Sequence, residues 1–296
     1  MKNKFIIFLI FCFSIFISCS NYNITDRIGN EIIIPKKIDK IVSLSPAITE
    51  ILIDLNLANN IVACDIYSKD ILIKYNKYIN VNNIDYSSPD YEKIISINPD
   101  ILFVNSLTLF YGSNAIEHIK NIGICVIVIP SSDSIIDIEK DILFISSILG
   151  KKEDGEKIVN DMNTNIEKIK LISSNIKHKK KIYFEIDFSP NFYSFGKNVF
   201  LDEMINIIGA ENIFKNENSW ISISEENILS HNPDVILTSV DYIDDPVKEI
   251  LNRKAWQNIN AIKNKEVYYI NYSSLANHNI INSLFEMYNY VYNDFK

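Results

Sequence analysis

Two glutamates and two aromatic residues stand at matching positions in a stretch of sequence that occurs twice. Tyr86 and Trp220 each lie six residues before a glutamate, Glu92 or Glu226, and an Asn-Pro-Asp triplet followed by an apolar run lies behind each glutamate. Aromatic side chains can hold a flat, largely apolar ligand. A carboxylate in the first turn of a helix is favoured by the helix dipole by about 0.3–1 kcal/mol, whatever its function. The repetition predicts a chain of two similar halves.

Each copy predicts a short helix that leads into a buried strand. Ser88 and Ser222 are the expected N-caps, with Pro89 in the first helical position of one copy and Glu225 completing a capping box in the other. The Asn-Pro-Asp triplet ends the helix, because the residue before a proline avoids helical backbone angles. The apolar run behind it is a core strand. In open α/β sheets such junctions tend to face a ligand crevice.

Composition excludes several functional classes. The chain has 296 residues, 47% of them hydrophobic, which is enough for two domains. Its formal charge of -8 argues against nucleic acid as a partner. None of its seven glycines are spaced as Gly-x-Gly, so neither a dinucleotide fingerprint nor a P-loop is present.

The N-terminus predicts export. Two lysines precede an uncharged, almost wholly apolar run at residues 5–18, which is too short for a membrane span of about 20 residues and fits a signal peptide at 1–18. Ile17-Ser18-Cys19 resembles a bacterial lipobox, although Phe16 stands where Leu is usual. We expect Cys19 to be lipidated, residues 19–40 to form a tether, and the protein to be anchored to the cell envelope, facing the periplasm or the outer side of the cytoplasmic membrane. The alternative is an ordinary exported protein cut near Ser18.

The remaining thiols and the histidines suggest no metal site. Cys64 and Cys125 each lie in a predicted buried strand, where a free cysteine packs as a small hydrophobe, so we expect no disulfide. The four histidines show no metal-ligand spacing, and His231 is expected to lie at the surface or to cap a helix end.

Strands alternate with helices along the rest of the chain, which predicts an α/β fold with mostly parallel sheets covered on both faces. We expect an N-terminal lobe at 41–150, an interlobe helix at 151–178 and a C-terminal lobe at 179–296. Within the interlobe segment, apolar residues recur at helical spacing over residues 153–176 without proline, so the two Rossmann-like lobes are joined by a rigid helix.

Five aromatic residues are predicted in strand-to-helix loops, where they could clamp a flat ligand between the lobes. They are Tyr67, Tyr86, Phe188, Phe192 and Trp220. Each tyrosine is alternatively a phenolate ligand for ferric iron.

From residue 40 to the C-terminus the chain resembles the helical-backbone (class III) substrate-binding proteins of ABC importers, which carry cobalamin, siderophore–iron or haem. The motifs that carry the resemblance are Lys40-Ile-Val-Ser-Leu-Ser-Pro-Ala-Ile-Thr-Glu-Ile51 and the segments 86–103, 195–198, 209–214 and 220–237. The similarity is greatest to the cobalamin-binding branch.

The resemblance implies roles for particular residues. Glu92 and Glu226 match the glutamates that dock on arginines of the membrane permease. Tyr67, Tyr86 and Trp220 match aromatics that line the cleft, although cobalamin binders tend to have Trp at the position of Tyr86. The implied partners are a metal chelate and a permease dimer with its ATPase subunits, with the binding protein acting as a monomer. No catalytic residue, resident cofactor or bound metal ion is implied.

The ligand is expected to be cobalamin or another corrinoid, because only Arg27 and Arg253 could supply the guanidinium forks that carboxylate-bearing chelates require, and neither is in a predicted cleft loop. An iron–siderophore complex or haem remains open, with Lys197 as a possible cation. Two further readings are an exported α/β hydrolase, which would need an activated nucleophile, and a receptor for free Zn or Mn ions, which would need clustered His and Asp.

Overall fold

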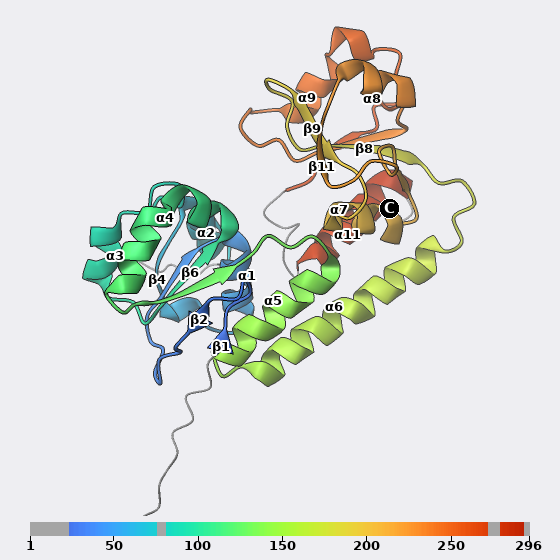
Figure 1. The fold of residues 1–296 in the computed structure, drawn as a ribbon. Helices are drawn as coiled ribbons and strands as arrows, with labels where there is room; N and C mark the ends of the chain where they lie inside the picture. The colour runs from blue at the N-terminus through green and yellow to red at the C-terminus, as the bar shows by residue number, and fades with distance from the viewer. Residues whose placement is uncertain (1–23, 76–80, 272–278, 293–296) are drawn as a thin grey trace, which may run out of the picture.

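The computed structural model describes residues 24–75, 81–271 and 279–292. Two α/β lobes are joined along one side by a long helix (Figure 1). The expected signal peptide at 1–18, the expected lipidation site Cys19, and His278 lie outside the described residues. No helix in the described part of the chain is long and apolar enough to cross a bilayer.

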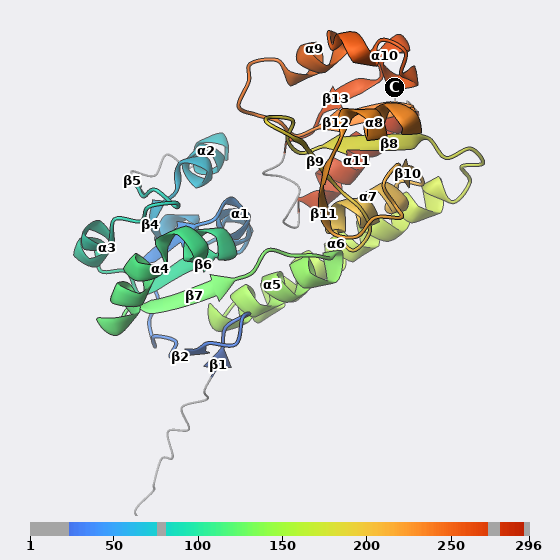
Figure 2. The same cartoon turned by 45° about the horizontal axis from the view of Figure 1, so that its top comes forward.

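The N-terminal lobe is a parallel five-stranded sheet with strand order β5-β4-β3-β6-β7. Alternate residues of its strands face two separate apolar cores, one on each side of the sheet. Helices cover both faces (Figure 2). The strands are β3 (Ile41–Leu44), β4 (Ile61–Cys64), β5 (Asn82–Asn83), β6 (Ile101–Asn105) and β7 (Cys125–Ile129), and the helices are α1 (Pro46–Asp54), η1 (Ala58–Asn60), α2 (Ile66–Lys74), α3 (Tyr91–Ile97), α4 (Ser106–Asn121) and α5 (Ile135–Ile148).

The C-terminal lobe has a parallel four-stranded sheet with order β10-β8-β12-β13, and a separate antiparallel ribbon of β9 and β11. Its strands are β8 (Lys181–Glu185), β9 (Phe192–Phe195), β10 (Glu211–Asn212), β11 (Trp220–Ile223), β12 (Val235–Thr238) and β13 (Val267–Tyr269). Its helices are α7 (Phe200–Ile207), α8 (Glu225–His231), α9 (Pro246–Leu251), η2 (Lys254–Trp256), α10 (Asn260–Lys263) and α11 (Ile280–Tyr292). The predicted α/β class with parallel sheets in two lobes is confirmed.

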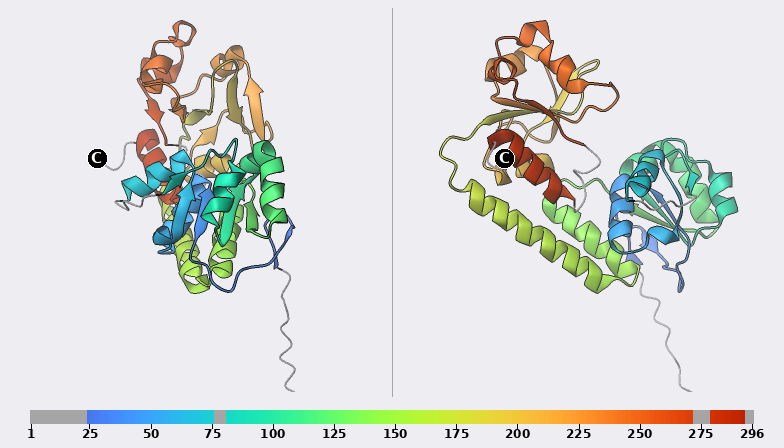
Figure 3. Two further views of the ribbon diagram at one scale, coloured as in Figure 1. Left: turned by 90° about the vertical axis from the view of Figure 1, so that its left-hand side faces the viewer. Right: turned by 180° about the vertical axis from the view of Figure 1, so that it is seen from behind.

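The interlobe helix is α6 (Lys152–Ser173), whose 22 residues span about 33 Å. It forms a helical hairpin with α5 through a turn at Gly150, whose φ of 68° suits glycine. At the helix crossing a Cβ on Gly155 would lie 1.9 Å from Ser146 Oγ, so the two helices meet at a distance that only glycine permits. On the other side α11 lies over α6 (Figure 3), so the strut is supported by both lobes.

The repeated unit folds as a helix followed by a core strand in both lobes. Asn98 and Asn232 end α3 and α8 with φ of 50° and 46°, the left-handed conformation that asparagine tolerates. The expected caps at Ser88 and Ser222 are wrong. Asp90 and Ser224 cap the helices two residues later, and in the second copy this is because Ser222 belongs to the extended strand β11.

The aspartate of each Asn-Pro-Asp triplet ties its unit to the neighbouring strand. Asp100 Oδ2 accepts hydrogen bonds from the backbone N–H groups of Asp39 and Lys40, just before β3, at 2.8 Å each. Asp234 Oδ2 accepts one from the N–H of Lys181 at the start of β8, at 3.0 Å. Each triplet therefore ends a helix, and its aspartate also positions the neighbouring strand, β3 or β8. That strand pairs with the one that follows the triplet, β6 or β12.

Residues 24–34 do not form the free tether that the sequence suggested. They contain a two-stranded hairpin, β1 (Ile24–Thr25) and β2 (Glu31–Ile32), folded against β7. Buried Asp26 accepts a hydrogen bond from Val128 N at 3.2 Å, and it also closes the hairpin turn. A buried carboxylate that satisfies backbone donors in this way holds the segment on the lobe.

The two described cysteines are free, as expected. Cys64 lies in β4 and Cys125 in β7, which are three strand positions apart in the sheet. That separation is about 14 Å, whereas a disulfide requires Cα atoms within about 7 Å. Burial raises the pKa of the Cys64 thiol to about 12 and that of Cys125 to about 11.

Candidate functional site

A cleft of about 450 Å³ lies between the lobes. This volume is in the range that encloses small organic ligands. Its lining comes from both lobes and is mostly apolar: Ser45, Pro46, Ala47, Ile48, Ile51, Asn105, Leu107, Ile129, Pro130, Ser131, Ser132, Ile138 and Asp141 from the N-terminal lobe, and Ile186, Tyr193, Phe200 and Trp220 from the C-terminal lobe.

The N-terminal side of the cleft is formed at the carboxyl ends of three parallel strands. Ser45 follows β3, Asn105 ends β6, and Pro130 follows β7. Helices α1 and α4 begin at the first two of these junctions. Strand ends in open α/β sheets are the common position of a ligand crevice.

The C-terminal side is formed by one face of the β9–β11 ribbon. Trp220 pairs with Phe195, and Ser222 pairs with Tyr193. Because alternate side chains of a strand point to the same side, these four side chains share one face of the ribbon. The rings of Tyr193 and Trp220 are parallel within 5°, with centroids 6.4 Å apart, and Phe195 packs edge-on behind Trp220. Together these three rings form an aromatic wall.

The predicted ligand residues fall into three groups. Trp220 lines the cleft. Tyr67 and Tyr86 lie together on the N-terminal lobe, with ring centroids 6.2 Å apart, but they are not part of the cleft lining. Phe188 and Phe192 both lie against Arg253 in the C-terminal lobe and are not part of the cleft lining.

Tyr193 is not among the predicted ligand residues, because the sequence analysis places its neighbour Phe192 in a loop and not in a strand. The sequence Phe192-Tyr193-Ser194-Phe195 forms strand β9, in which neighbouring side chains point to opposite faces. Phe192 packs on Trp256 at 5.6 Å between centroids, whereas Tyr193 faces the cleft. Alternation along this segment was the signal that could have separated the two residues.

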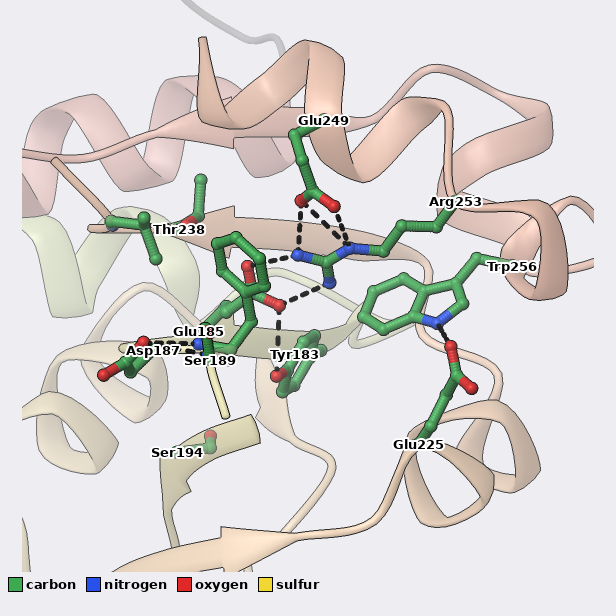
Figure 4. A network of polar contacts seen from close by, with 12 residues as sticks. Tyr183, Glu185, Asp187, Ser189, Ser194, Glu225, Thr238, Glu249, Arg253 and Trp256 are labelled. Atoms are coloured by element: carbon green, nitrogen blue, oxygen red, sulfur yellow. Dashed lines mark hydrogen bonds and ion pairs between the residues drawn. The ribbon is translucent and has the colours of Figure 1, made fainter. Parts of the chain in front are cut away.

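Behind the aromatic wall, Arg253 forms the centre of a buried polar cluster (Figure 4). Its Nη1 and Nη2 donate to the two oxygens of Glu185 at 2.6 and 3.0 Å, and Nη2 also donates to Glu249 at 2.5 Å. The guanidinium carbon lies 4.9, 5.2 and 4.4 Å from the ring centroids of Phe188, Phe192 and Trp256. Burial raises the pKa of Glu185, and the contact with Arg253 opposes that shift.

The side chains of this cluster bind one another and are not available to a ligand. The side chain of Arg253 is 8% exposed. Trp256 is fully buried, and its Nε1 donates to Glu225 Oε1 at 2.8 Å. Arg253, Trp256 and Glu225 are therefore structural residues.

Asp141 is the one charged side chain among the described residues that line the cleft. Its Oδ1 accepts from Arg27 Nε at 2.5 Å, and its Oδ2 from the Ser132 hydroxyl at 3.0 Å. Burial raises the pKa of Asp141, while Arg27 and Ser132 act in the opposite direction. With both oxygens bonded and a guanidinium attached, this corner is close to neutral. Lys197 is exposed and is not part of the lining.

Glu92 and Glu226 are both exposed in the first turns of α3 and α8. Among the residues that the structure describes, neither forms an ion pair or a side-chain hydrogen bond. Glu225, which precedes Glu226, by contrast accepts a hydrogen bond from Trp256. The two glutamates are thus equivalent within their lobes and accessible to a partner.

The described part of the chain contains no group of three or more His, Cys, Asp or Glu side chains that could hold a metal ion. His231 lies at the end of α8, with Nδ1 2.8 Å from Asn227 O, and its ring packs on Phe214. His118 packs edge-on against Tyr91, with ring centroids 4.9 Å apart. These contacts give both histidines structural roles.

The sequence matches a known protein family and is similar to individual members of it. The model of the periplasmic binding protein family matches residues 41–272. An uncharacterized ABC transporter substrate-binding lipoprotein of Bacillus subtilis, YvrC, is 30% identical over 252 residues, which are 83% of this chain and 76% of the relative.

Two solved structures with the same fold are named for the binding of different ligands. One is a possible iron-binding (periplasmic solute-binding) protein from Staphylococcus epidermidis, with a TM-score of 0.75, 24% identity, and coverage of 87% of this chain and 100% of that one. The other is the vitamin B12 binding protein BtuF of Vibrio cholerae, with a TM-score of 0.66, 19% identity, and coverage of 86% and 96%. At these identities they show the fold alone. The family match over 41–272, with the two-lobed architecture and the cleft between the lobes, shows that the chain belongs to the periplasmic binding protein family.

Proposed function

We propose that this protein binds a metal chelate in the interlobe cleft and delivers it to the permease of an ABC importer, and that the chelate is cobalamin or a related corrinoid. The observation that carries the proposal is the cleft itself, in which the aromatic wall of Tyr193 and Trp220 faces the strand ends of the other lobe. The importer role is supported by the relative named as an ABC transporter substrate-binding lipoprotein.

The charge of the lining supports a neutral ligand. No Lys, Arg or His is among the described residues that line the cleft, and Asp141 is already paired with Arg27. Carboxylate siderophores and haem propionates bring negative charge that calls for a cationic partner. A corrinoid presents mainly uncharged amides, which the Ser and Asn side chains of the lining can bind. An iron chelate or haem is the second candidate, because one similar structure is named as possibly iron-binding.

Binding of the purified protein tests the ligand. Cyanocobalamin, haem and ferric siderophore complexes are titrated against protein that lacks residues 1–19, and tryptophan fluorescence is measured. Ligand binding is expected to quench Trp220, which lines the cleft, so Trp220→Phe, in which only the buried Trp256 remains, should show a smaller change in fluorescence. Absence of binding by all three classes of ligand would refute the proposal.

We further propose that Glu92 and Glu226 dock on the permease. Both are exposed and lie at the same position of the repeated unit, one in each lobe. The double variant Glu92→Ala/Glu226→Ala is expected to keep ligand affinity and to lose uptake. Glu153→Ala, which removes an exposed first-turn carboxylate from α6, is the matched control. Uptake that is equal in the double variant and the control would exclude the docking role.

Anchoring through a lipid on Cys19 is part of the same proposal and is supported by the relative named as a lipoprotein. Radioactive palmitate is expected to label the wild-type protein and not Cys19→Ala. Equal labelling of both would show that the lipid is not on Cys19. No observation favours the hydrolase, and no described cluster of side chains favours a receptor for free Zn or Mn.

A further inference from the structure

Three large apolar side chains are exposed side by side at the start of α4. Leu107, Phe110 and Tyr111 are 45%, 76% and 59% exposed. The rings of Phe110 and Tyr111 are in edge-on contact at 5.1 Å between centroids. A contiguous group of this kind on a soluble domain marks a binding surface more often than three isolated residues do.

The spacing of these residues is that of an apolar helix stripe turned outward. Positions i, i+3 and i+4 share one helix face, and such a face normally packs on a core. Here the inward face belongs to Thr108, which is fully buried and donates its hydroxyl to Leu44 O at 3.3 Å. The core contacts of this turn are therefore made without Leu107, Phe110 or Tyr111.

A break in α4 at Gly112 sets the direction of this face. Gly112 has non-helical angles of φ -104° and ψ 18°. A Cβ there would lie 2.7 Å from Cδ of Pro89, which is buried. The segment 106–111 is thus a separate short helix, held at an angle to the rest of α4 by the packing of Pro89 on Gly112.

The exposed face is continuous with the cleft. Leu107 is itself part of the cleft lining, next to Asn105. Farther out, Tyr86 and Tyr67 lie nearby on the same lobe. Burial raises the pKa of Tyr86, and the proximity of Tyr67 and Tyr111 contributes to that shift. An aromatic surface therefore extends from the cleft mouth along α4.

We propose that Leu107, Phe110 and Tyr111 form an outer shelf of the cleft, and that this shelf binds the part of a corrinoid-sized chelate that the cleft does not enclose. This inference rests on the proposed function. A cleft of about 450 Å³ suits a drug-sized ligand, and a corrinoid with its amide side chains is larger than that. Phe110 and Leu107 offer apolar contact to the edge of the macrocycle, and the Tyr111 hydroxyl can donate a hydrogen bond to an amide carbonyl.

The composition of the shelf favours the ligand over the permease as its occupant. Residues 106–116 contain no acidic side chain, whereas the proposed permease contacts are carboxylates on α3 and α8. The shelf also begins inside the cleft, at Leu107, and not on the docking helices.

The test compares Phe110→Ser/Tyr111→Ser with the wild-type protein. Isothermal calorimetry with cyanocobalamin is expected to show at least about tenfold weaker binding in the variant, with unchanged circular dichroism and thermal midpoint. The matched control is Leu171→Ser/Ile172→Ser, which removes two neighbouring exposed apolar residues from α6 and is expected to bind like the wild type.

Four other outcomes would overturn the shelf. Equal affinity of variant and wild type for cyanocobalamin excludes a ligand contact. Equal affinity together with loss of permease-stimulated ATP hydrolysis assigns the surface to the permease. A wild-type dimer that becomes monomeric in the variant, measured by light scattering, assigns it to a second copy of the chain. If the wild type binds none of cyanocobalamin, haem and ferric siderophores, the proposed function fails and the shelf fails with it, whereas the first three outcomes leave the proposed function intact.

Discussion

The two lobes share a folding unit but use the two arginines of the chain differently. In the N-terminal lobe Arg27 reaches from the β1–β2 hairpin to Asp141 and keeps 22% of its side chain exposed. In the C-terminal lobe Arg253 is 8% exposed, is bonded to Glu185 and Glu249, and is surrounded by three aromatic rings.

This difference affects the two walls of the cleft. The loop that follows Glu185 is fixed by the hydrogen bond from Tyr242 to Asp187 at 2.6 Å, and the backbone of Asp187 in turn pairs with that of Tyr193. These contacts hold the backbone of the aromatic wall in the C-terminal lobe. Support of this kind is needed to position a binding side chain accurately. On the N-terminal lobe, the predicted ligand residues Tyr67 and Tyr86 lie outside the cleft lining, and the Tyr67 side chain is 49% exposed.

Replacing each arginine by methionine is expected to show the largest difference. Arg253→Met leaves the buried carboxylate of Glu185 unpaired and should lower the free energy of unfolding by about 3–5 kcal/mol. Arg27→Met should cost about 1–3 kcal/mol, because Arg27 is partly exposed and Asp141 keeps its bond from Ser132. Urea unfolding measures both. Equal losses would show that the Arg253 cluster is no stronger than the N-terminal pair.

Two neighbouring residues of β9 test whether the ribbon separates structure from binding. Phe192→Ala should lower the free energy of unfolding by about 2 kcal/mol, since it removes a ring packed on Trp256 and Arg253. Tyr193→Ala should change stability by less than about 1 kcal/mol. Ligand affinity should respond in the opposite order, with at least about tenfold weaker binding in Tyr193→Ala. A similar loss of affinity in both variants would mean that the two faces of the ribbon do not have separate roles.

The aspartates of the two Asn-Pro-Asp triplets test what the lobes have in common. Asp100→Ala and Asp234→Ala should each cost about 1–2 kcal/mol, because each removes a charged acceptor from backbone N–H groups at the start of a strand. Asp133→Ala, an exposed aspartate in the segment between β7 and α5, serves as the control for thermal unfolding. A loss of stability in only one of the two variants would show that the two aspartates do not have the same role in their lobes.

The smallest effect is expected at the contact between the lobes. Glu203 on α7 accepts a hydrogen bond from Ile135 N, at the start of α5, at 3.2 Å. Burial raises the pKa of Glu203, and Asp137 and Asp202 add to the shift while Ile135 N and Lys170 oppose it. Since the folded protein then holds the proton more tightly than the unfolded chain, this group stabilises the fold below the ordinary carboxyl pKa. That contribution is lost as the pH rises through the raised pKa.

Glu203→Gln keeps an acceptor for Ile135 N and removes the titration. The stability of the variant relative to the wild type should therefore increase between about pH 4 and pH 7. Thermal midpoints of the variant and the wild type across that range measure this difference. A stability difference that is constant with pH would contradict the assigned shift.

Local sequence determined the class of the fold and the repeated unit. Asn98 and Asn232 end their helices as the Asn-Pro-Asp triplets predict, because a residue before proline cannot continue a helix. Strands flanked by helices predicted parallel sheets, and the stripe of apolar residues around residue 160 predicted the interlobe helix. These features depend on backbone preferences and on periodicity, which act over a few residues.

Only the tertiary structure decided which side chains face the cleft. The sequence analysis placed Phe192 at the cleft, whereas Tyr193 faces it in the structure. Which of the two side chains faces the cleft depends on the pairing of β9 with β11, a strand 28 residues away, because a shift of one residue would turn each side chain to the opposite face of the ribbon. The same holds for Arg253, Glu185 and Glu249, which are brought together by the packing of α9 on the sheet. The hairpin at residues 24–32 folds onto the lobe through Asp26 and Val128, a contact across 102 residues that no local pattern indicates.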